Sequence, residues 1–210
     1  MKAYLAADGR AEHEIVIHRS RFIATAQFVK DFEEAAAFVA EIKKKYSDAT
    51  HNCYAFISNA AGTEQRFSDD GEPQGTAGMP ILEVLKKRGL KCTAAVVTRY
   101  FGGVKLGAGG LVSAYTQSAA EALDKIKTVC FRYSRVLEFE CPYNSYNGLQ
   151  QLFKSGNFKV LSADFDNSVK IRMAVPVEDA ADAEAKINDA LSGQADIKCV
   201  FEDYCKYDNE

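Results

Sequence analysis

The sequence lacks the features that direct a chain into a membrane or an oxidising compartment. No apolar segment near Met1 has the length of a signal peptide, and no apolar run approaches the roughly 18 residues of a membrane span. The cysteines are scattered and form no Cys-x-x-Cys pair: Cys53, Cys92, Cys130, Cys141, Cys199 and Cys205. We therefore expect reduced thiols in a cytoplasmic protein, without a disulfide framework, a zinc site or membrane contact.

Signatures of several enzyme classes are also missing. There is no serine-nucleophile elbow, no His-Glu-x-x-His motif and no protein-kinase signature set. The glycines match neither the Walker pattern nor the dinucleotide fingerprint. The sequence therefore does not require catalysis, and it predicts no cofactor and no bound metal.

Charge is distributed unevenly along the 210 residues. Residues 1–128 carry 17 Lys and Arg against 15 Asp and Glu, a net charge of +2. Residues 129–210 carry 9 against 14, a net charge of −5. A general nucleic-acid coat protein would be more basic throughout, so any contact with nucleic acid must be local.

The hydrophobic pattern predicts an α+β protein of two domains, residues 1–127 and 128–210, joined by a very short linker. In the first domain we expect an irregular start over residues 1–12, followed by mixed strands and helices. The second domain has the order β-α-β-β-α-β, which is the split βαβ arrangement of ferredoxin-like domains.

The most informative stretch is residues 96–112, in which an apolar run leads into five glycines around Lys105. A strand, a glycine-rich loop and a helix start place backbone N–H groups at the positive end of a helix. Arg99 and Lys105 would add full positive charge, which predicts a site for an anion such as phosphate. A tight corner whose glycines only allow close packing is the alternative.

A second stretch, residues 66–80, is rich in turn formers and carries Asp69, Asp70 and Glu72. These carboxylates are the ligands that Mg²⁺ prefers, and with the glycine loop they would form a hydrolytic or phosphoryl-transfer site. The alternative, which we favour, is that they cap the following helix or pair with Arg66 and Arg99.

Two smaller groups have both a functional and a structural interpretation. His51 and Cys53 lie two apart in a strand and so share a face, as a base and nucleophile would, although such a cysteine is more often a small buried hydrophobe. Tyr100 and Phe101 would stack on bases if exposed, whereas alternation predicts that one of them packs in the core.

These motifs together resemble the Impact family, in particular its bacterial YigZ-like members. The match runs from about Ser20 to Tyr115 and includes residues 51–56, 66–80 and 99–107. The resemblance implies an N-terminal α/β sandwich like the fourth domain of elongation factor G, a ribosomal-protein-type fold, and a C-terminal domain like its fifth. It also implies association with structured RNA or the ribosome. Ser113 departs from the family, which often has a basic residue there.

We therefore expect a nucleic-acid- or ribosome-associated factor, with a role in regulating translation, that holds phosphate in a groove of the first domain. The C-terminal domain would contact a protein partner. The expected phosphate-binding residues are Arg99, Lys105, Gly102, Gly103, Gly107, Gly109, Gly110 and Arg66. The expected groove-lining residues are His51, Asp69, Asp70, Glu72, Thr76 and Tyr100. A small-molecule enzyme acting on a phosphorylated substrate is the alternative, and a protein-interaction adaptor ranks third.

Overall fold

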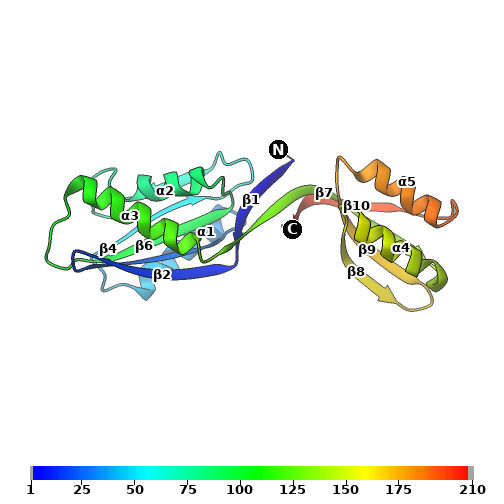
Figure 1. The fold of residues 1–210 in the computed structure, drawn as a ribbon, viewed down its shortest axis with the longest axis horizontal. Coiled ribbons are helices and arrows are strands. Elements are labelled where there is room, and N and C mark those ends of the chain that lie inside the picture. Colours follow the sequence, from blue (N-terminus) through cyan, green and yellow to red (C-terminus); the bar gives the residue numbers. More distant parts are fainter. Residues whose placement is uncertain (1, 208–210) are drawn as a thin grey trace. The chain divides into compact units, whose positions relative to one another are not determined.

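The computed structural model describes residues 2–207, which form two compact α+β units divided between Cys130 and Phe131. Figure 1 shows the elements of each unit. All six cysteines are free. Among the described residues, no helix combines the length and the apolarity that crossing a membrane requires.

The first unit contains a five-stranded antiparallel sheet in the order β2-β3-β6-β4-β5. Its elements are β1 (Ala3–Asp8), β2 (Arg10–Ile17), β3 (Ser20–Phe28), α1 (Phe32–Lys45), β4 (His51–Ile57), β5 (Gln65–Ser68), α2 (Gly78–Lys87), β6 (Thr93–Tyr100) and α3 (Gly107–Leu123).

The irregular start expected over residues 1–12 is wrong, because β1 and the beginning of β2 lie there. The edge strand β2 alternates exposed and half-buried residues and contains Arg10, Glu12 and Glu14. Edge strands often carry charge. Because of these charged residues, the hydrophobic pattern of the sequence did not predict the start of this strand.

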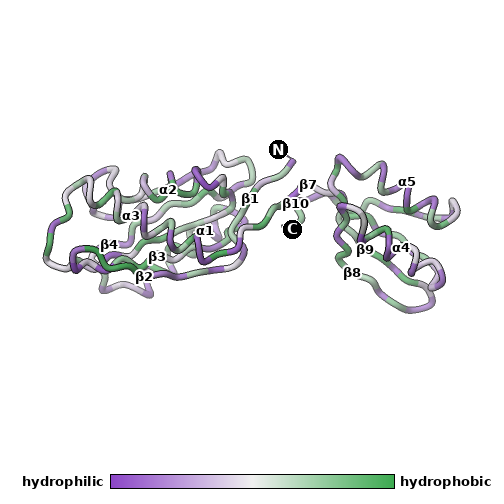
Figure 2. Tube along the Cα trace, in the orientation of Figure 1, coloured by the Kyte–Doolittle hydropathy of each residue, from purple (hydrophilic) through white to green (hydrophobic). Residues whose placement is uncertain are grey.

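Helices cover both faces of this sheet. Helices α2 and α3 pack on one face around a core that includes Phe22, Ala95 and Val97. Helix α1 packs on the other face against Phe56 and Val96. Alternate residues of one strand therefore face different helices, which is the expected period of two. In Figure 2, α2 and α5 alternate between hydrophilic and hydrophobic positions, as amphipathic helices do.

The second unit has the element order β-α-β-β-α-β. The chain enters it within the continuous strand β7, so the short linker expected near Lys127 is part of a strand. Strand β9 lies between β7 and β8, β10 pairs with β7, and α4 and α5 pack beside each other. Its elements are β7 (Lys127–Cys141), α4 (Tyr143–Ser155), β8 (Lys159–Phe165), β9 (Val169–Pro176), α5 (Ala180–Ala190) and β10 (Lys198–Tyr207).

Candidate functional site: a buried ion pair beside a glycine-rich loop

The register of the first sheet gathers polar side chains on the face covered by α2 and α3. Arg99 in β6 lies opposite both His51 in β4 and Phe22 in β3. Cys53, two residues after His51, lies opposite Val97, two residues before Arg99. Because side chains two apart share a face, His51, Cys53 and Arg99 all point toward α3.

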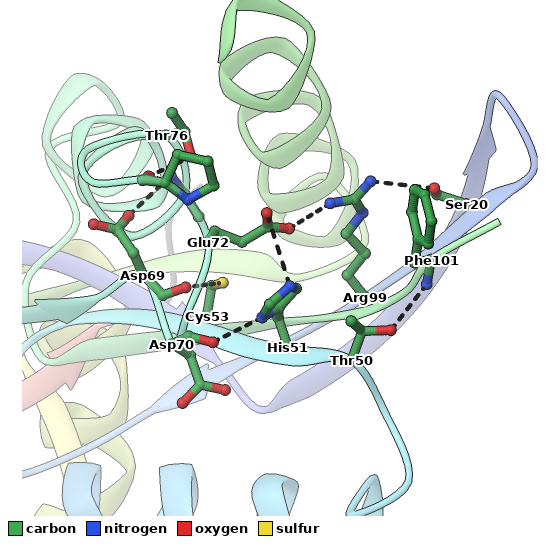
Figure 3. Close-up of polar contacts among 12 residues, drawn as sticks. Ser20, Thr50, His51, Cys53, Asp69, Asp70, Glu72, Thr76, Arg99 and Phe101 are labelled. Carbon is green, nitrogen blue, oxygen red and sulfur yellow. Dashed lines mark hydrogen bonds and ion pairs between the residues drawn. The ribbon is translucent and has the colours of Figure 1, made fainter. Parts of the chain in front are cut away.

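A tight turn adds Glu72 to this group. The Glu72 N–H donates to the Asp69 carbonyl (2.9 Å), and Asp70 and Gly71 between them have φ of 45° and 90°. Positive φ at both central residues is typical of a type I′ turn, for which Asp-Gly is a favoured pair. The turn brings the Glu72 side chain over the sheet (Figure 3).

Glu72 and Arg99 form an ion pair with side chains that are only 4% and 6% exposed. Arg99 Nη1 lies 2.6 Å from Glu72 Oε1, which also accepts a hydrogen bond from the Tyr115 hydroxyl (2.8 Å). Arg99 Nη2 donates to Ser20 Oγ (3.3 Å), and the guanidinium stacks against the rings of Phe22 and Phe101. Arg99 is thus already neutralised and held in place within the protein.

His51 lies beside this pair in a defined orientation. Its Nδ1 is 2.8 Å from the Asp70 carbonyl oxygen, and since a carbonyl only accepts, Nδ1 must carry the hydrogen. In the neutral ring, Nε2 therefore has the lone pair. Nε2 lies 3.9 Å from Glu72 Oε2, too far for a direct hydrogen bond (Figure 3).

Cys53 is a fully buried hydrophobe, as its position in a strand predicted. Its Sγ donates to the Asp69 carbonyl (2.9 Å), and burial raises the pKa of the thiol to about 12. Because the thiolate is the reactive form, Cys53 does not have the character of a nucleophile.

Asp69 of the acidic loop stabilises the loop and the start of α2. Asp69 Oδ1 accepts hydrogen bonds from the N–H groups of Ala77 (3.0 Å) and Gly78 (2.8 Å), and Oδ2 accepts one from Gly75 (2.8 Å). Burial acts to raise the Asp69 pKa, but these three N–H groups outweigh it and lower that pKa. Asp69 thereby caps α2, which confirms the structural interpretation for this residue.

Asp70 and Glu72 are likewise paired within the protein. Asp70 contacts Lys43 Nζ (2.5 Å) and the Asn52 N–H (2.7 Å). Burial acts to raise the Asp70 pKa, but the hydrogen bonds from Lys43 and Asn52 outweigh it and lower that pKa. Glu72 pairs with Arg99 as described. Within residues 2–207, no group of three or more His, Cys, Asp or Glu side chains is arranged to hold a metal ion.

The N–H groups in the first half of the glycine-rich loop form hydrogen bonds within the protein. The N–H groups of Phe101 and Gly102 donate to the hydroxyls of Thr50 (3.0 Å) and Ser20 (3.2 Å). A Cβ on Gly102 would overlap the Arg19 carbonyl, so only glycine fits there. These N–H groups are therefore already satisfied.

The second half of the loop is open. Gly107 begins α3 with a φ of 71°, and the helix has no side-chain cap and no acidic residue in its first turn. Ala108 and Gly109 are exposed, and a Cβ on Gly109 would have no atom within 4 Å. Lys105 is exposed, and it makes no hydrogen bond or ion pair with the described residues. Free N–H groups and an unpaired cation thus occur together.

Lys105 lines two cavities. The first, of about 450 Å³, is lined by His51, Glu72, Arg99, Phe101, Lys105 and Gly107 among others. The second, of about 360 Å³, is lined by Lys105, His18, Gly110 and Ser113 among others. The substituted family position, Ser113, thus lies in a cavity that Lys105 also lines.

Several predicted residues do not line the 450 Å³ cavity: Asp69, Asp70, Gly102, Gly103, Gly109 and Gly110, together with Arg66, Tyr100 and Thr76. Arg66 stacks over Phe32, which packs with α1 on the other face of the sheet. Tyr100 donates to Asp48 (2.8 Å) under Arg21, and Thr76 donates to the Pro73 carbonyl (2.6 Å). The expectation that Tyr100 or Phe101 packs in the core is wrong, since Tyr100 is half-buried and Phe101 is 47% exposed.

Sequence reasoning missed Ser20, Thr50 and the polar role of Tyr115. Tyr115 is buried in the core, and its hydroxyl also donates a hydrogen bond to Glu72. No local motif marks these residues, because their partners are more than 30 residues away in the chain.

The fold and site together define a class: a two-unit α+β protein with a buried Arg–Glu pair beside an uncapped, glycine-rich helix start. The model of the Impact N-terminal domain matches residues 18–123, and that of a domain of unknown function (DUF1949) matches residues 139–194. The chain belongs to the Impact family, which the motifs of residues 51–56, 66–80 and 99–107 predicted.

Full-length relatives agree with this assignment. The IMPACT family member YvyE of Bacillus subtilis (strain 168) is 39% identical over 198 residues, covering 94% of this chain and 91% of YvyE. YigZ of Escherichia coli (strain K12) is 36% identical over 190 residues, covering 89% and 92%. A crystal structure described as a hypothetical protein is similar with a TM-score of 0.63 and 32% identity, covering 97% of this chain and 100% of that one.

Proposed function

We propose that the first unit binds a phosphate-bearing ligand, an RNA backbone free or within the ribosome, at the N-terminus of α3. The observation that carries this proposal is the unpaired Lys105 beside the open first turn of α3. Backbone N–H groups at a helix start favour anions, and a nearby ammonium group adds a full charge.

The residues around this corner fit such a ligand. Gly103, Gly107 and Gly109 leave open space in which a phosphate can approach the backbone, while Gly102 and Arg99 fix the shape of the loop. Phe101, which lines the 450 Å³ cavity, offers an exposed ring for stacking on a base. Single-stranded nucleic acid is bound elsewhere by this combination of cation and aromatic ring.

The same proposal assigns roles to the two units. We propose that the first is like the fourth domain of elongation factor G, that the second is ferredoxin-like, and that the protein acts on translation in the cytoplasm. The order β10-β7-β9-β8 together with β-α-β-β-α-β connectivity supports the ferredoxin-like assignment. With its net negative charge, the second unit would contact a protein and not RNA.

The test is the binding of single-stranded RNA to the full chain by fluorescence anisotropy, over a range of salt concentrations. Lys105→Ala should weaken binding about five- to tenfold at low salt and make the plot of log K against log salt shallower by about one. Lys44→Ala removes the same charge from exposed α1, on the other face of the sheet, and should change little. Equal losses in both variants, or no binding by the wild type, would refute the proposal.

A small-molecule enzyme acting on a phosphorylated substrate in this cavity is a second candidate. It is favoured by the orientation of His51, because the Asp70 carbonyl holds Nδ1–H and leaves the lone pair of Nε2 available to accept a proton, as a general base does. Turnover of a mononucleotide or sugar phosphate that is lost in His51→Ala, in a protein that does not bind RNA, would support this candidate over the first.

A further inference from the structure

We propose that His51 and Glu72 recognise the 2′-hydroxyl of a ribose whose phosphate lies at the N-terminus of α3, so that the site selects RNA over DNA. This inference rests on the proposed function and specifies its ligand. It starts from a carboxylate oxygen at the cavity that accepts no hydrogen bond from the described residues.

That atom is Oε2 of Glu72. The Glu72 side chain is 4% exposed, and its Oε1 already accepts from Arg99 and Tyr115. Within residues 2–207, the one recorded polar neighbour of Oε2 is His51 Nε2 at 3.9 Å. Glu72 lines the 450 Å³ cavity, so a ligand bound there can donate a hydrogen bond to Oε2 in place of water.

The oxygen cannot readily turn away to find another donor. Arg99 and Tyr115 hold the other oxygen of the same carboxylate at 2.6 and 2.8 Å, and the Asp70–Gly71 turn fixes the backbone. His51 is held by its hydrogen bond to the Asp70 carbonyl on the same turn. The two side chains are therefore preorganised for a group that enters from the cavity.

A buried polar atom without a hydrogen-bond partner among the described residues also lies at this cavity. Arg99 Nε makes no hydrogen bond, although Arg99 is 5% exposed and lines the cavity. The cavity thus contains an acceptor and a donor that the protein itself does not satisfy. Both observations point to a polar ligand and are independent of the helix start.

A hydroxyl next to a phosphate is the ligand group that fits these facts. It can donate its one hydrogen to Glu72 Oε2 or to the lone pair of His51 Nε2, two acceptors that lie 3.9 Å apart. Lys105, Gly107 and Ala108 line the same cavity, so a phosphate at α3 would place an adjoining sugar near Glu72. Ribose carries such a hydroxyl and deoxyribose does not, which is how proteins distinguish RNA from DNA.

The experiment compares homouridine oligonucleotides that carry 2′-hydroxyl, 2′-fluoro, 2′-O-methyl or 2′-deoxy groups, with the full chain in the anisotropy assay. The 2′-fluoro ligand is the matched control, because it keeps the sugar pucker of RNA but cannot donate a hydrogen. The 2′-hydroxyl ligand should bind about tenfold more tightly than the other three.

Two variants of the protein separate this inference from the proposed function. His51→Ala should reduce the preference for the 2′-hydroxyl over the 2′-fluoro ligand toward one, because water then reaches Glu72 Oε2. Lys105→Ala should weaken binding of all four ligands by the same factor. Equal binding of the 2′-hydroxyl and 2′-fluoro ligands that still depends on Lys105 would overturn this inference alone. Loss of Lys105 dependence would overturn both.

Discussion

Arg99 and Lys105 are six residues apart in the same motif, yet the structure treats their charges in opposite ways. Arg99 is 5% exposed, paired with Glu72 and enclosed by two aromatic rings. Lys105 is exposed and has no partner among the described residues. A planar guanidinium suits a buried pair of fixed geometry, whereas an ammonium group on a flexible stem suits a mobile phosphate contact.

The difference separates two tasks within one stretch of sequence. The part from Arg99 to Gly102 holds the strand end, the acidic turn and the loop together through Glu72, Ser20 and Thr50. The part from Lys105 to Gly110 is left open to solvent. Substitutions in the first part should therefore reduce stability, and those in the second should change binding.

The largest effect is expected at the buried pair. Glu72→Gln keeps the shape of the side chain but leaves the Arg99 charge uncompensated, and should lower the free energy of unfolding by about 3–5 kcal/mol. Lys105→Ala should change it by less than about 0.5 kcal/mol. Urea unfolding followed by circular dichroism measures both. Similar losses of stability in the two variants would contradict the separation of a stabilising part, Arg99 to Gly102, from a binding part, Lys105 to Gly110.

The next largest change in stability is expected from a glycine substitution in the stabilising part, compared with one in the binding part. Gly102→Ala forces a Cβ against the Arg19 carbonyl and should cost about 1–3 kcal/mol. Gly109→Ala enters open space in the first turn of α3 and should be neutral or stabilise the protein by up to about 1 kcal/mol. A destabilising Gly109→Ala would show that the loop is packed there.

The sequence predicted the components of this site better than their assembly. Alternation in β4 and β6 was sufficient to place His51 and Cys53 on one face, and turn chemistry indicated that a carboxylate would cap α2. The Glu72–Arg99 pair was foreseen only as one of several pairings, because residues 27 apart meet through strand register. Arg66 was misplaced for the same reason: its register opposite Phe56 directs it to the face of α1.

A smaller effect concerns the Asp69 cap. Asp69→Asn should cost about 1 kcal/mol at pH 7, since the amide replaces a charged acceptor of three backbone N–H groups. The lowered Asp69 pKa means that this stabilisation is present above the unfolded-state pKa of about 4 and is lost as the pH falls through the folded-state pKa.

The difference between wild type and Asp69→Asn should therefore shrink in acid, as measured by thermal unfolding between neutral and acidic pH. Asp189→Asn, at an exposed position in α5, should stay within about 0.5 kcal/mol of wild type throughout. A difference for Asp69→Asn that is constant with pH would exclude the carboxylate charge as the source of the capping.

The smallest effect is expected from Ser113, where the resemblance to the family led us to expect a basic residue. Ser113 is exposed and lines the 360 Å³ cavity together with Lys105, on α3 two turns from the helix start. Ser113→Lys should raise RNA affinity by about two- to fivefold at low salt, because it adds one phosphate contact. It should also make the plot of log K against log salt steeper by about one.

Ser113→Gln, of similar length without charge, is the control. If Ser113→Lys increases affinity in Lys105→Ala as much as in the wild type, the two cations contact different phosphates. If it does so only with Lys105 present, they hold the same one, and the open part of the loop is a single anion site.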